Sequence, residues 1–509
     1  MEKHTFLVLD FGSQLTQLIA RRLRELGYYS EIHPYNLSLE KIKALKPVGI
    51  ILSGGPNSVY EEGAPYRPVK ELLDLAPLLG ICYGMQLIAK DLGGVVEKSS
   101  HREYGFNRIQ WSQSAGLQET SQKVWMSHGD IVRQPPAGCQ VIATSEGNHP
   151  AAMKGERILS LQFHPEVAHT EQGEKILQYY AQNMCRVEPD WRAPQIAELL
   201  QEQVRQKAGA TDHVLVGLSG GVDSSVVATL LTRALGPERV HCVFVNNGLL
   251  RQNEFRDVMA QYEKIGLNVK GVDATGEFLT ALKGLSDPEQ KRKAIGRVFI
   301  EIFEKSMDPQ WPIKWLAQGT LYPDVIESVS FHGGPSQTIK SHHNVGGLPE
   351  KMKLGLIEPV RELFKDEVRR VGAELGLPAE MLGRHPFPGP GLAIRIMGEV
   401  TEPDLQVLRE ADHIFISHLR EKKLYDKIWQ AFCVLLPVKT VGVQGDGRTY
   451  DKVLALRAVT SSDGMTADWY PFEFEFMRDV SNEITNKVHG VNRVVYDVTS
   501  KPPGTIEWE

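Results

Sequence analysis

The sequence has few features of an exported or membrane-bound protein. Its 509 residues include only five cysteines, which lie far apart and form no CxxC pair. We therefore expect neither a disulfide framework nor a zinc site, and we expect the reducing cytoplasm as its compartment. The N-terminal stretch MEKHTFLVLDF lacks the layout of a signal peptide, and no apolar run is long enough to span a bilayer.

An excess of positive charge and internal repeats are also missing. Lys and Arg number 57 against 63 Asp and Glu, which gives a formal net charge of −6. This balance argues against nucleic acid and against a membrane surface as partners. Hydrophobic residues make up 42% of the chain, enough for several cores. The length favours roughly three domains.

The apolar pattern divides the chain into three regions. Residues 1–190 alternate short apolar runs such as VGIILSGG with amphipathic stretches such as TQLIARRLRELG. This alternation is typical of an α/β domain with a largely parallel sheet. It lapses at VEPDWRAPQ and resumes over residues 191–385, and HPFPGPG then leads into residues 386–509. We predict two parallel-sheet α/β domains followed by a small C-terminal α+β domain.

A cysteine stands at a predicted turn between a strand and a helix. In LLGICYGMQLIAK, Cys82 lies between Gly80 and Gly84, which gives a nucleophile elbow with Cys in place of Ser. The start of the following helix favours the thiolate, the reactive form of the side chain. A small buried cysteine at a strand end is the alternative.

Partners for such a nucleophile occur in ILSLQFHPEV. His164 and Glu166 are two residues apart at the end of a predicted strand, so both can point to one face. Glu166 can then orient the imidazole of His164, as in a catalytic triad. A structural His–Glu pair is the alternative for this motif taken alone.

Two further stretches of the first region offer groups for a substrate. Gly54 and Gly55 of LSGGPNSV follow a predicted strand, and their N–H groups with that of Tyr83 are candidates for an oxyanion hole. An ordinary glycine turn is the alternative. Ser127 and His128 of MSHGD are candidates for polar contacts to a small substrate, with a solvated loop as the alternative.

The second region begins with a glycine-rich loop, SGGVDSS, between the strand HVLVGL and a helix. It lacks the lysine of a Walker A loop and is not a GxGxxG motif. Its glycines still permit close approach to an anion, and its serines stand at a helix N-terminus. Asp223 fits a phosphate site only with a cation, so we assign it to Mg²⁺. The loop consists of Ser219, Gly220, Gly221, Val222, Asp223, Ser224 and Ser225. A serine-capped glycine turn is the structural alternative.

The motifs of the first region together resemble the class I glutamine amidotransferases over about residues 5–185. This resemblance rests on GICYGMQ, SGGPNSV, MSHGD and FHPE. It implies that Cys82 attacks the side-chain amide of glutamine and releases ammonia. It also implies that His164 is the general base, that Glu166 orients it, and that Gln86 helps to bind glutamine.

The loop SGGVDSS resembles that of the N-type ATP pyrophosphatases, which cut ATP between its α and β phosphates. In that family the loop holds the departing pyrophosphate, so the missing lysine charge must come from elsewhere. Lys340 of IKSHHNVGGLP and Lys365 of ELFKDEVR are the candidates, with a solvated charge as the alternative for each. Gly319, Thr320 and Asp324 match the active-site segment of the family.

Four separated stretches resemble the family of glutamine-hydrolysing GMP synthases over essentially the whole chain. They are LDFGSQLTQLIARR, RHPFPGPGLAIR, VGVQGDGRTYD and YDVTSKPPGTIEWE. The resemblance implies GMP synthesis from xanthosine monophosphate (XMP), ATP and glutamine through an adenylated intermediate, with release of AMP, pyrophosphate and glutamate. It further implies Mg²⁺ with ATP, no tightly bound organic cofactor, and a homodimer formed through the C-terminal domain. The implied contacts to XMP are Arg251, Asp446, Lys501 and Glu507.

The chain departs from the family pattern at two positions, and three other functions are alternatives. Leu15 stands where Tyr is common, and Asn246 stands where Asp is usual, so a charged metal contact at position 246 is in doubt. The nearest alternative is another glutamine-dependent AMP-forming ligase, such as an NAD synthetase. A tRNA-modifying enzyme would need a basic surface or a relay thiol, and a binding protein would not need the triad.

Overall fold

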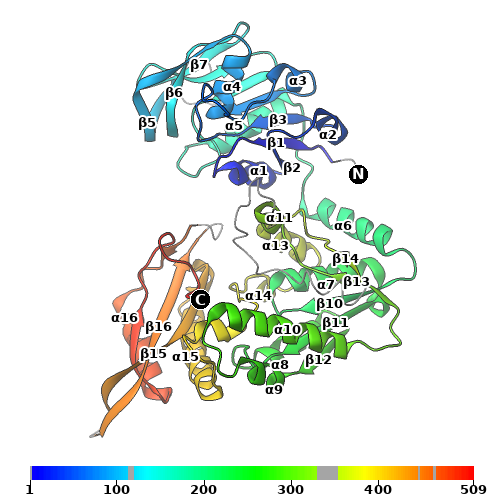
Figure 1. The fold of residues 1–509 in the computed structure, drawn as a ribbon, viewed down its shortest axis with the longest axis vertical. Coiled ribbons are helices and arrows are strands. Elements are labelled where there is room, and N and C mark those ends of the chain that lie inside the picture. The colour runs from blue at the N-terminus through cyan, green and yellow to red at the C-terminus, as the bar shows by residue number, and fades with distance from the viewer. Residues whose placement is uncertain (1–2, 113–119, 329–353, 445–446, 462–465) are drawn as a thin grey trace. The chain divides into compact units, whose positions relative to one another are not determined.

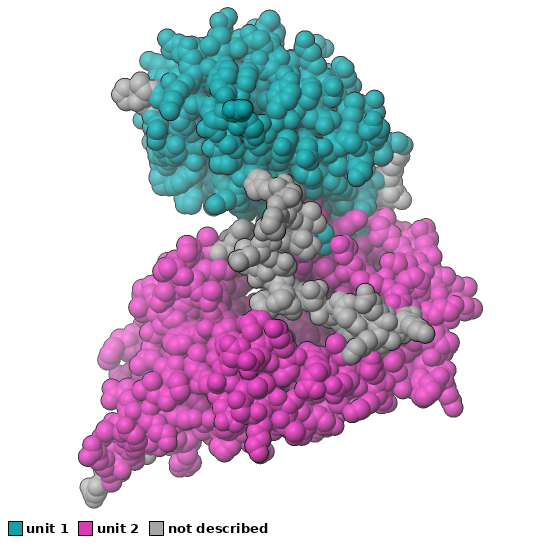
Figure 2. Space-filling view, viewed as in Figure 1, with its two compact units in different colours: residues 1–196, 325–339 teal, residues 197–324, 340–509 magenta. Residues whose placement is uncertain are grey.

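The computed structural model describes residues 3–112, 120–328, 354–444, 447–461 and 466–509 (Figure 1). The chain forms two compact units. The first consists of residues 1–196 with 325–339, and the second of residues 197–324 with 340–509 (Figure 2). Among the helices that the structure describes, none is both long and apolar enough to cross a bilayer.

The first unit contains a nine-stranded mixed sheet in the order β2-β1-β3-β4-β9-β8-β7-β5-β6. The first five strands are parallel, and the other neighbouring pairs are antiparallel. Its strands are β1 (Phe6–Asp10), β2 (Ser30–Pro34), β3 (Gly49–Leu52), β4 (Leu78–Ile81), β5 (Val95–Trp111), β6 (Ser121–Gln134), β7 (Gln140–Ser145), β8 (Pro150–Lys154) and β9 (Ile158–Leu161). Its helices are α1 (Thr16–Glu25), α2 (Leu39–Leu45), α3 (Val69–Leu73), α4 (Tyr83–Asp91), α5 (Gly173–Tyr179) and the π-helical turn Tyr180–Met184.

The parallel part of this sheet is formed by the apolar runs of the sequence. All residues of β1, β3, β4 and β9 are buried, as expected of parallel strands covered on both faces. The amphipathic stretch TQLIARRLRELG forms α1, which buries Ile19, Ala20 and Leu23. The sequence pattern did not predict β2, β6 or β8.

The second unit begins with α6 (Ala193–Ala208), which spans the unit boundary, and contains a five-stranded parallel sheet in the order β12-β11-β10-β13-β14. Because the strands are parallel, the loops after β10, β11 and β13 leave the same edge of the sheet. The strands are β10 (His213–Leu218), β11 (Val240–Asn246), β12 (Val269–Asp273), β13 (Ile313–Ala317) and β14 (Gly355–Ile357). The helices are α7 (Val222–Leu235), α8 (Glu254–Lys264), α9 (Thr275–Leu282), α10 (Pro288–Ser306), α11 (Tyr322–Ser328), α13 (Lys365–Glu374) and α14 (Ala379–Leu382), with a 3₁₀ turn at Pro237–Arg239.

The rest of the second unit is a small mixed sheet with two helices. The long strands β15 (Gln430–Gln444) and β16 (Gly447–Thr460) are antiparallel, and β16 also pairs with β17 (Asp468–Trp469) and, in parallel, with β18 (Val491–Tyr496). Figure 1 shows this ribbon beside α15 (Glu402–Glu421) and α16 (Phe474–Lys487). Short 3₁₀ turns occupy Gly391–Arg395 and Tyr425–Lys427. The predicted fold class, two parallel-sheet α/β parts and a C-terminal α+β part, is confirmed.

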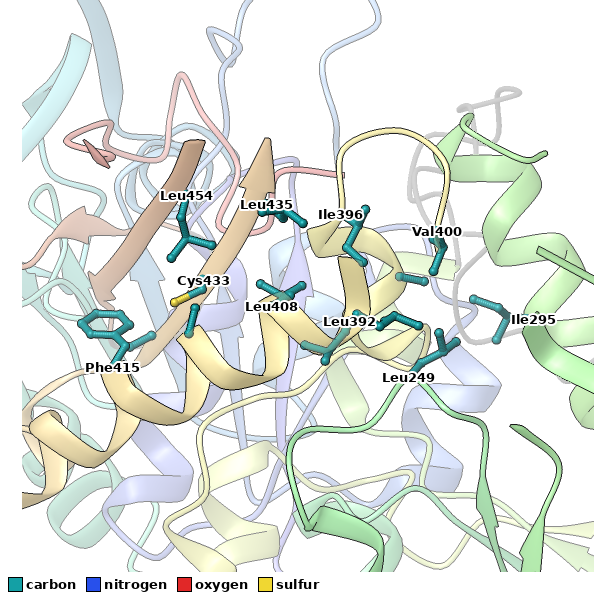
Figure 3. Close-up of a cluster of buried hydrophobic side chains, with 14 of the residues drawn as sticks. Leu249, Ile295, Leu392, Ile396, Val400, Leu408, Phe415, Cys433, Leu435 and Leu454 are labelled. Carbon is teal, nitrogen blue, oxygen red and sulfur yellow. The ribbon is translucent and has the colours of Figure 1, made fainter. Parts of the chain in front are cut away.

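One hydrophobic core runs through both sheets of the second unit (Figure 3). Leu249 and Ile295 come from the α/β part, whereas Leu408, Phe415 and Cys433 come from the C-terminal part. All of these side chains are buried in one cluster. The two parts of this unit therefore share a core, and domain limits at residues 191 and 386 remain a prediction.

The C-terminal tail is held by buried cations and by backbone contacts. Arg395 donates two hydrogen bonds to the Glu507 carboxylate, at 3.1 and 2.8 Å. Arg457 donates to the carbonyl groups of residues 499 and 505. Lys291 of α10, fully buried, contacts the carboxylate of Glu509 at 2.7 Å. The tail thus links α10 to the C-terminal sheet.

Candidate active sites

The structure places Cys82 at the turn between β4 and α4. Its backbone has φ 52°, a left-handed value that an L-residue adopts only under constraint. The neighbouring Gly84 is required by packing, because a Cβ there would lie 2.3 Å from the carbonyl oxygen of Leu52. The predicted strand–turn–helix elbow is therefore present. It presents the thiol at the N-terminus of α4.

His164 and Glu166 form a buried pair just after β9. His164 Nδ1 lies 2.7 Å from Glu166 Oε1, and Glu166 has no exposed surface. The strand ends at Leu161, so both residues lie in a turn, and the expected alternation along a strand was the wrong reason for their pairing. The His164 backbone is fixed instead by hydrogen bonds with Trp125 and Thr170.

The electrostatics of this pair favour a protonated imidazole. Burial opposes the charge, but the carboxylate of Glu166 and a hydrogen bond with Cys82 outweigh it, so the pKa of His164 is raised well above its ordinary value. Since Nδ1 faces Glu166, Nε2 is the nitrogen available to the thiol. The Cys82 Sγ also lies 3.6 Å from the carbonyl oxygen of Ser127. In this arrangement the imidazole of His164 can accept the proton of the Cys82 thiol and become an imidazolium that Glu166 stabilises.

The candidate oxyanion groups lie around this cysteine. A Cβ on Gly54 would lie 3.2 Å from His164 Cε1, and a Cβ on Gly55 would lie 3.3 Å from Tyr83 Cγ. The Tyr83 amide is one of the first amides of α4, which have no partner within the helix. The structure therefore brings together Gly54, Gly55 and the Tyr83 amide beside Cys82 and His164.

Two other residues predicted to contact glutamine, Gln86 and His128, have polar contacts within the protein itself. Gln86 is buried and donates to the carbonyl oxygen of Asp130 at 2.9 Å. The motif MSHGD lies in β6 and not in a loop. His128 Nδ1 lies 3.1 Å from the same Asp130 oxygen, and its Nε2 lies 3.1 Å from Glu103 Oε2. Ser127 is exposed, and its carbonyl group reaches Cys82.

Glu103 is a residue of this site region that the sequence did not reveal. It lies on β5, paired with β6, and has a mostly buried side chain. Burial opposes its ionisation most strongly, yet the neighbouring side chains of His128 and Ser145 overcome this and lower its pKa. No spacing rule links it to His128, because the two meet only through the pairing of strands β5 and β6.

In the second unit, SGGVDSS forms the turn between β10 and α7. Gly220 has φ 74°, and Gly221 caps the helix. The Ser224 hydroxyl lies 3.1 Å from that of Ser219, and Ser225 donates to the Gly221 carbonyl at 2.7 Å. The loop therefore closes on itself at the N-terminus of a 14-residue helix, which suits an anion.

Lys365 lies beside this loop, at the first residue of α13. Its Nζ is 3.2 Å from Asp223 Oδ2. The other oxygen, Oδ1, is buried and has no hydrogen-bond partner in the described structure. Such an oxygen fits a cation, and Mg²⁺ commonly takes one or two carboxylates together with substrate phosphates. Within the described ranges, no three His, Cys, Asp or Glu side chains gather as a metal site.

The segment after β13 also faces the loop. A Cβ on Gly319 would lie 3.5 Å from Asp223 Cβ. Thr320 donates to Glu358 at 2.5 Å, and Asp324 accepts from the amide of Leu321 at 3.0 Å. The predicted Lys340 lies outside the described residues. Asn246 ends β11 at the same sheet edge.

The amide of Asn246 serves the local fold. Its Oδ1 accepts a hydrogen bond from the Gly248 amide at 3.2 Å. Residue 246 also lies in register with Asp273 of the neighbouring strand β12. Hydrogen bonds from Thr275 lower the pKa of Asp273, and a hydrogen bond from Asn246 adds to this. The amide therefore supports a carboxylate on the next strand.

One of the residues predicted to contact XMP, Arg251, lies near an aromatic ring. Arg251 and Arg395 approach the Phe387 ring to 5.0 and 5.2 Å, and Arg395 in turn holds Glu507. Arg251 is also paired with the buried Asp412 at 3.0 Å. Lys501 exchanges backbone hydrogen bonds with residue 467. The predicted Asp446 lies outside the described residues.

Two cavities flank these side chains. One, of about 450 Å³, is lined by Arg251, Glu254, Arg384, Asp412 and Tyr425 among others. The other, of about 490 Å³, is lined by residues of β18 and the tail, including Glu507 and Trp508. The predicted contacts Arg251 and Glu507 thus line different cavities of the second unit.

His385, next in sequence to Arg384, is buried and neutral, and its ring contacts the backbone of Tyr425 and of Ala431. Its Nε2 lies 2.8 Å from the carbonyl oxygen of Tyr425, while its Nδ1 accepts from the amide of Ala431 at 3.2 Å. A second ring proton would face the Ala431 amide. Burial lowers the pKa of His385 to about 4, and the charges of Arg251 and Arg420 add to this.

We therefore expect acid to destabilise the second unit through His385. Between about pH 6.5 and about pH 4 the folded state binds fewer protons than the unfolded state. The stability of the fold therefore decreases as the pH is lowered through this window, and it levels off below about pH 4. The full loss is about 3 kcal/mol. Urea unfolding of His385→Gln from pH 7 to pH 4 should show a shallower decline than wild type. The exposed His413 supplies the control His413→Gln, and equal slopes in all three proteins would contradict the assignment.

Comparison with known families assigns each part of the chain. Residues 7–183 match the model of class-I glutamine amidotransferases, and residues 193–296 match that of NAD synthase. Residues 417–508 match the model of the GMP synthase C-terminal domain. The fold, the cysteine elbow and the glycine-rich loop define the class as a glutamine-dependent ligase that uses ATP.

Whole-chain relatives then specify the family. The glutamine-hydrolysing GMP synthase of Bdellovibrio bacteriovorus is 70% identical over 504 residues, which cover 99% of each chain. That of Cytophaga hutchinsonii is 55% identical, again over 99% of each chain. The chain belongs to the family of glutamine-hydrolysing GMP synthases, and it is an enzyme of glutamine-dependent GMP synthesis. The NAD synthetase alternative is a match of one domain only.

Proposed function

We propose that Cys82, His164 and Glu166 release ammonia from glutamine. His164 takes the proton of the Cys82 thiol, and the thiolate attacks the side-chain amide carbon. The oxyanion then accepts hydrogen bonds from the amides of Gly55 and Tyr83. His164 returns its proton to the departing ammonia, and water hydrolyses the thioester to glutamate. The observation that carries this proposal is the buried 2.7 Å contact between His164 and Glu166, which raises the pKa of the imidazole.

Residues Ser219–Ser225, with Gly319, are proposed to bind the phosphates of ATP. In the reaction expected of the family, the O2 oxygen of XMP attacks the α phosphate and pyrophosphate departs. AMP then leaves when ammonia attacks C2, which gives GMP. The amides at the start of α7 would stabilise the departing pair of phosphates. Free ammonium cannot attack, so ammonia must reach this site shielded from bulk water.

The charge that a Walker lysine would supply is assigned to Lys365 and Mg²⁺. Asp223, with its unpartnered Oδ1, would hold Mg²⁺, which would neutralise charge on the leaving pyrophosphate. Lys365 would then be released from its contact with Asp223 to face phosphate. Lys340 is proposed as a second phosphate contact. Arg251, Asp446, Lys501 and Glu507 are proposed to bind XMP, with Lys501 as a point charge for its phosphate.

We also propose that residues 386–509 pair two chains as a homodimer. Supporting this, the ribbon β15–β16 leaves several apolar side chains in solvent, including Val443, which is 77% exposed. Exposed apolar groups that gather on one element commonly mark an interface. The proposed division of labour is ammonia release by residues 1–190, adenylation by 191–385, and dimerisation with XMP binding by 386–509. Sedimentation should give a dimer, and Val443→Lys should weaken it.

The products of the reaction test the proposed chemistry directly. With XMP, ATP and glutamine, we expect AMP, pyrophosphate, glutamate and GMP in equal amounts. ADP in place of AMP would contradict cleavage between the α and β phosphates. Nicotinate adenine dinucleotide in place of XMP should give no amidated product, because the tail KPPGTIEWE and the GMP synthase C-terminal match point to XMP. Chromatography of the nucleotides is sufficient for both measurements.

A further inference from the structure

One carbonyl group of the glycine-rich loop is held from outside the loop. The Nη1 of Arg384, just after α14, donates to the Gly220 carbonyl oxygen at 2.8 Å. The next amide, that of Gly221, points to the Ser219 hydroxyl, 3.3 Å away. Gly220 has φ 74°, which only glycine adopts readily. Arg384 therefore contacts the peptide that joins the two glycines of the loop.

The geometry of a trans peptide gives this contact a consequence. The C=O of one residue and the N–H of the next point in opposite directions across the planar unit. While Arg384 holds the Gly220 carbonyl, the Gly221 N–H must point to the other side, toward the Ser219 hydroxyl. A flip of this peptide would exchange the two groups. It would then present an oxygen, in place of an N–H donor, to a bound anion.

The peptide between two glycines has little of its own to prevent such a flip. Neither residue has a Cβ, so both orientations are sterically open. Among the described residues, a Cβ on Gly221 would meet only the Ser219 hydroxyl, at 3.2 Å. The orientation therefore depends on hydrogen bonds, of which the one from Arg384 is charge-assisted and the one to Ser219 is long.

Arg384 is itself fixed by a second residue. Its Nη2 pairs with Glu254 Oε1, and the Glu254 side chain is only 5% exposed. The other oxygen of Glu254 accepts the backbone amide of Arg251 at 2.9 Å. The planar guanidinium thus bridges a loop carbonyl and a carboxylate on α8, an arrangement that the single point charge of lysine cannot reproduce.

We propose that Arg384 is a positioning residue that locks the Gly220–Gly221 peptide with its N–H toward the departing pyrophosphate. This rests on the proposed assignment of the loop to pyrophosphate. Arg384 does not itself touch the phosphates. It keeps a carbonyl dipole turned away from them and leaves one more donor for the leaving group. Since the same Glu254 holds the Arg251 backbone, the lock also ties the loop to the start of α8.

The variants Arg384→Met and Arg384→Lys test the proposal in the full-length enzyme. Initial rates are measured with ammonium chloride, so that the glutamine site is bypassed, and inorganic pyrophosphate is the probe. We expect the inhibition constant of pyrophosphate against ATP to rise about tenfold or more in Arg384→Met, as for the loss of one charge-assisted hydrogen bond. Arg384→Lys should fall between it and wild type. The KM for XMP should change less than twofold in both.

Arg233→Met is the matched control. Arg233 lies in the last turn of α7 and donates to the Leu375 carbonyl at 2.7 Å. The variant therefore removes a similar arginine–carbonyl hydrogen bond, but at the end of α7 that lies away from the loop. Its pyrophosphate inhibition should equal that of wild type. Thermal melting of each variant separates loss of folding from loss of the contact with Gly220. If Arg384→Met does not fold, the inhibition constant of pyrophosphate in Arg384→Lys tests the proposal.

Three results would overturn the proposal. An unchanged inhibition constant in Arg384→Met would show that the peptide needs no lock. Equal weakening of pyrophosphate and XMP would show a general distortion. The loop assignment is tested separately: if pyrophosphate does not compete with ATP in wild type and Ser224→Ala leaves the KM for ATP unchanged, the assignment fails and the inference fails with it. Competition in wild type that Arg384→Met does not alter defeats the inference alone.

Discussion

Replacing Cys82 by Ala is expected to abolish glutamine-dependent GMP formation while the rate with ammonium salts stays close to wild type. In the proposed mechanism the Cys82 thiolate forms the bond to glutamine, so its loss should lower the glutamine-dependent rate by at least about a thousandfold. The residues proposed for the synthetase chemistry belong to the second compact unit, and the change deletes only a buried sulfur of the first unit. Coupled assays with glutamine and with ammonium chloride give both rates.

Cys139→Ala provides the control for this experiment. Cys139 is a second thiol of the same unit, partly buried, and burial raises its pKa. It lies at no strand–helix elbow, unlike the proposed nucleophile Cys82, and its loss should leave both rates unchanged. Loss of the ammonium-dependent rate in Cys82→Ala would contradict a two-site enzyme. Survival of the glutamine-dependent rate would remove Cys82 from the mechanism.

The second large effect is expected in stability, at the contact between α10 and the tail. Lys291 has no exposed surface, and its Nζ donates to the carbonyl groups of Ala393 and Ile396 and to the Glu509 carboxylate. Glu509→Gln removes the only opposite charge that contacts Lys291 in the described structure. Leaving a buried charge unpaired costs about 3–5 kcal/mol. Urea unfolding of the second unit should show a loss of this size.

Two companion variants make the prediction specific. Glu289→Gln, at the exposed start of α10, breaks a pair with Arg292 and should cost less than about 1 kcal/mol. Lys291→Met introduced with Glu509→Gln removes both charges and should recover much of the loss. If the double variant is no more stable than Glu509→Gln alone, the destabilisation has a cause other than an unpaired charge.

The parts of the fold and site that the sequence predicted are those encoded within a few residues. The elbow at Cys82 follows from glycines two positions away on either side, and SGGVDSS from a strand and a helix that adjoin it. Parallel strands were predicted because they read as continuous apolar runs. By contrast, β6 alternates between buried and more exposed residues along much of its length. It also contains the polar motif MSHGD, so the sequence did not predict a strand there.

The contacts that the sequence could not reveal join residues far apart in the chain. Arg384 and Glu254 are separated by 130 residues, and no spacing rule relates them. His164 and Glu166 were paired correctly, but a turn and not a strand orients them. The contact of Lys365 with Asp223 was likewise not predicted, and its role at phosphate stays a prediction. In each case the missing information is the packing of elements, which composition and periodicity do not contain.

The contact between Lys291 and Glu509 also bears on how the chain folds during synthesis. The two residues are 218 positions apart. At roughly 5–20 residues per second, a ribosome needs roughly 10–40 s to add the intervening segment. Throughout that interval α10 carries a lysine whose final environment does not yet exist. The second unit therefore cannot reach its finished core while its tail is still in the ribosome, and Lys291 lacks its charged partner until Glu509 has emerged.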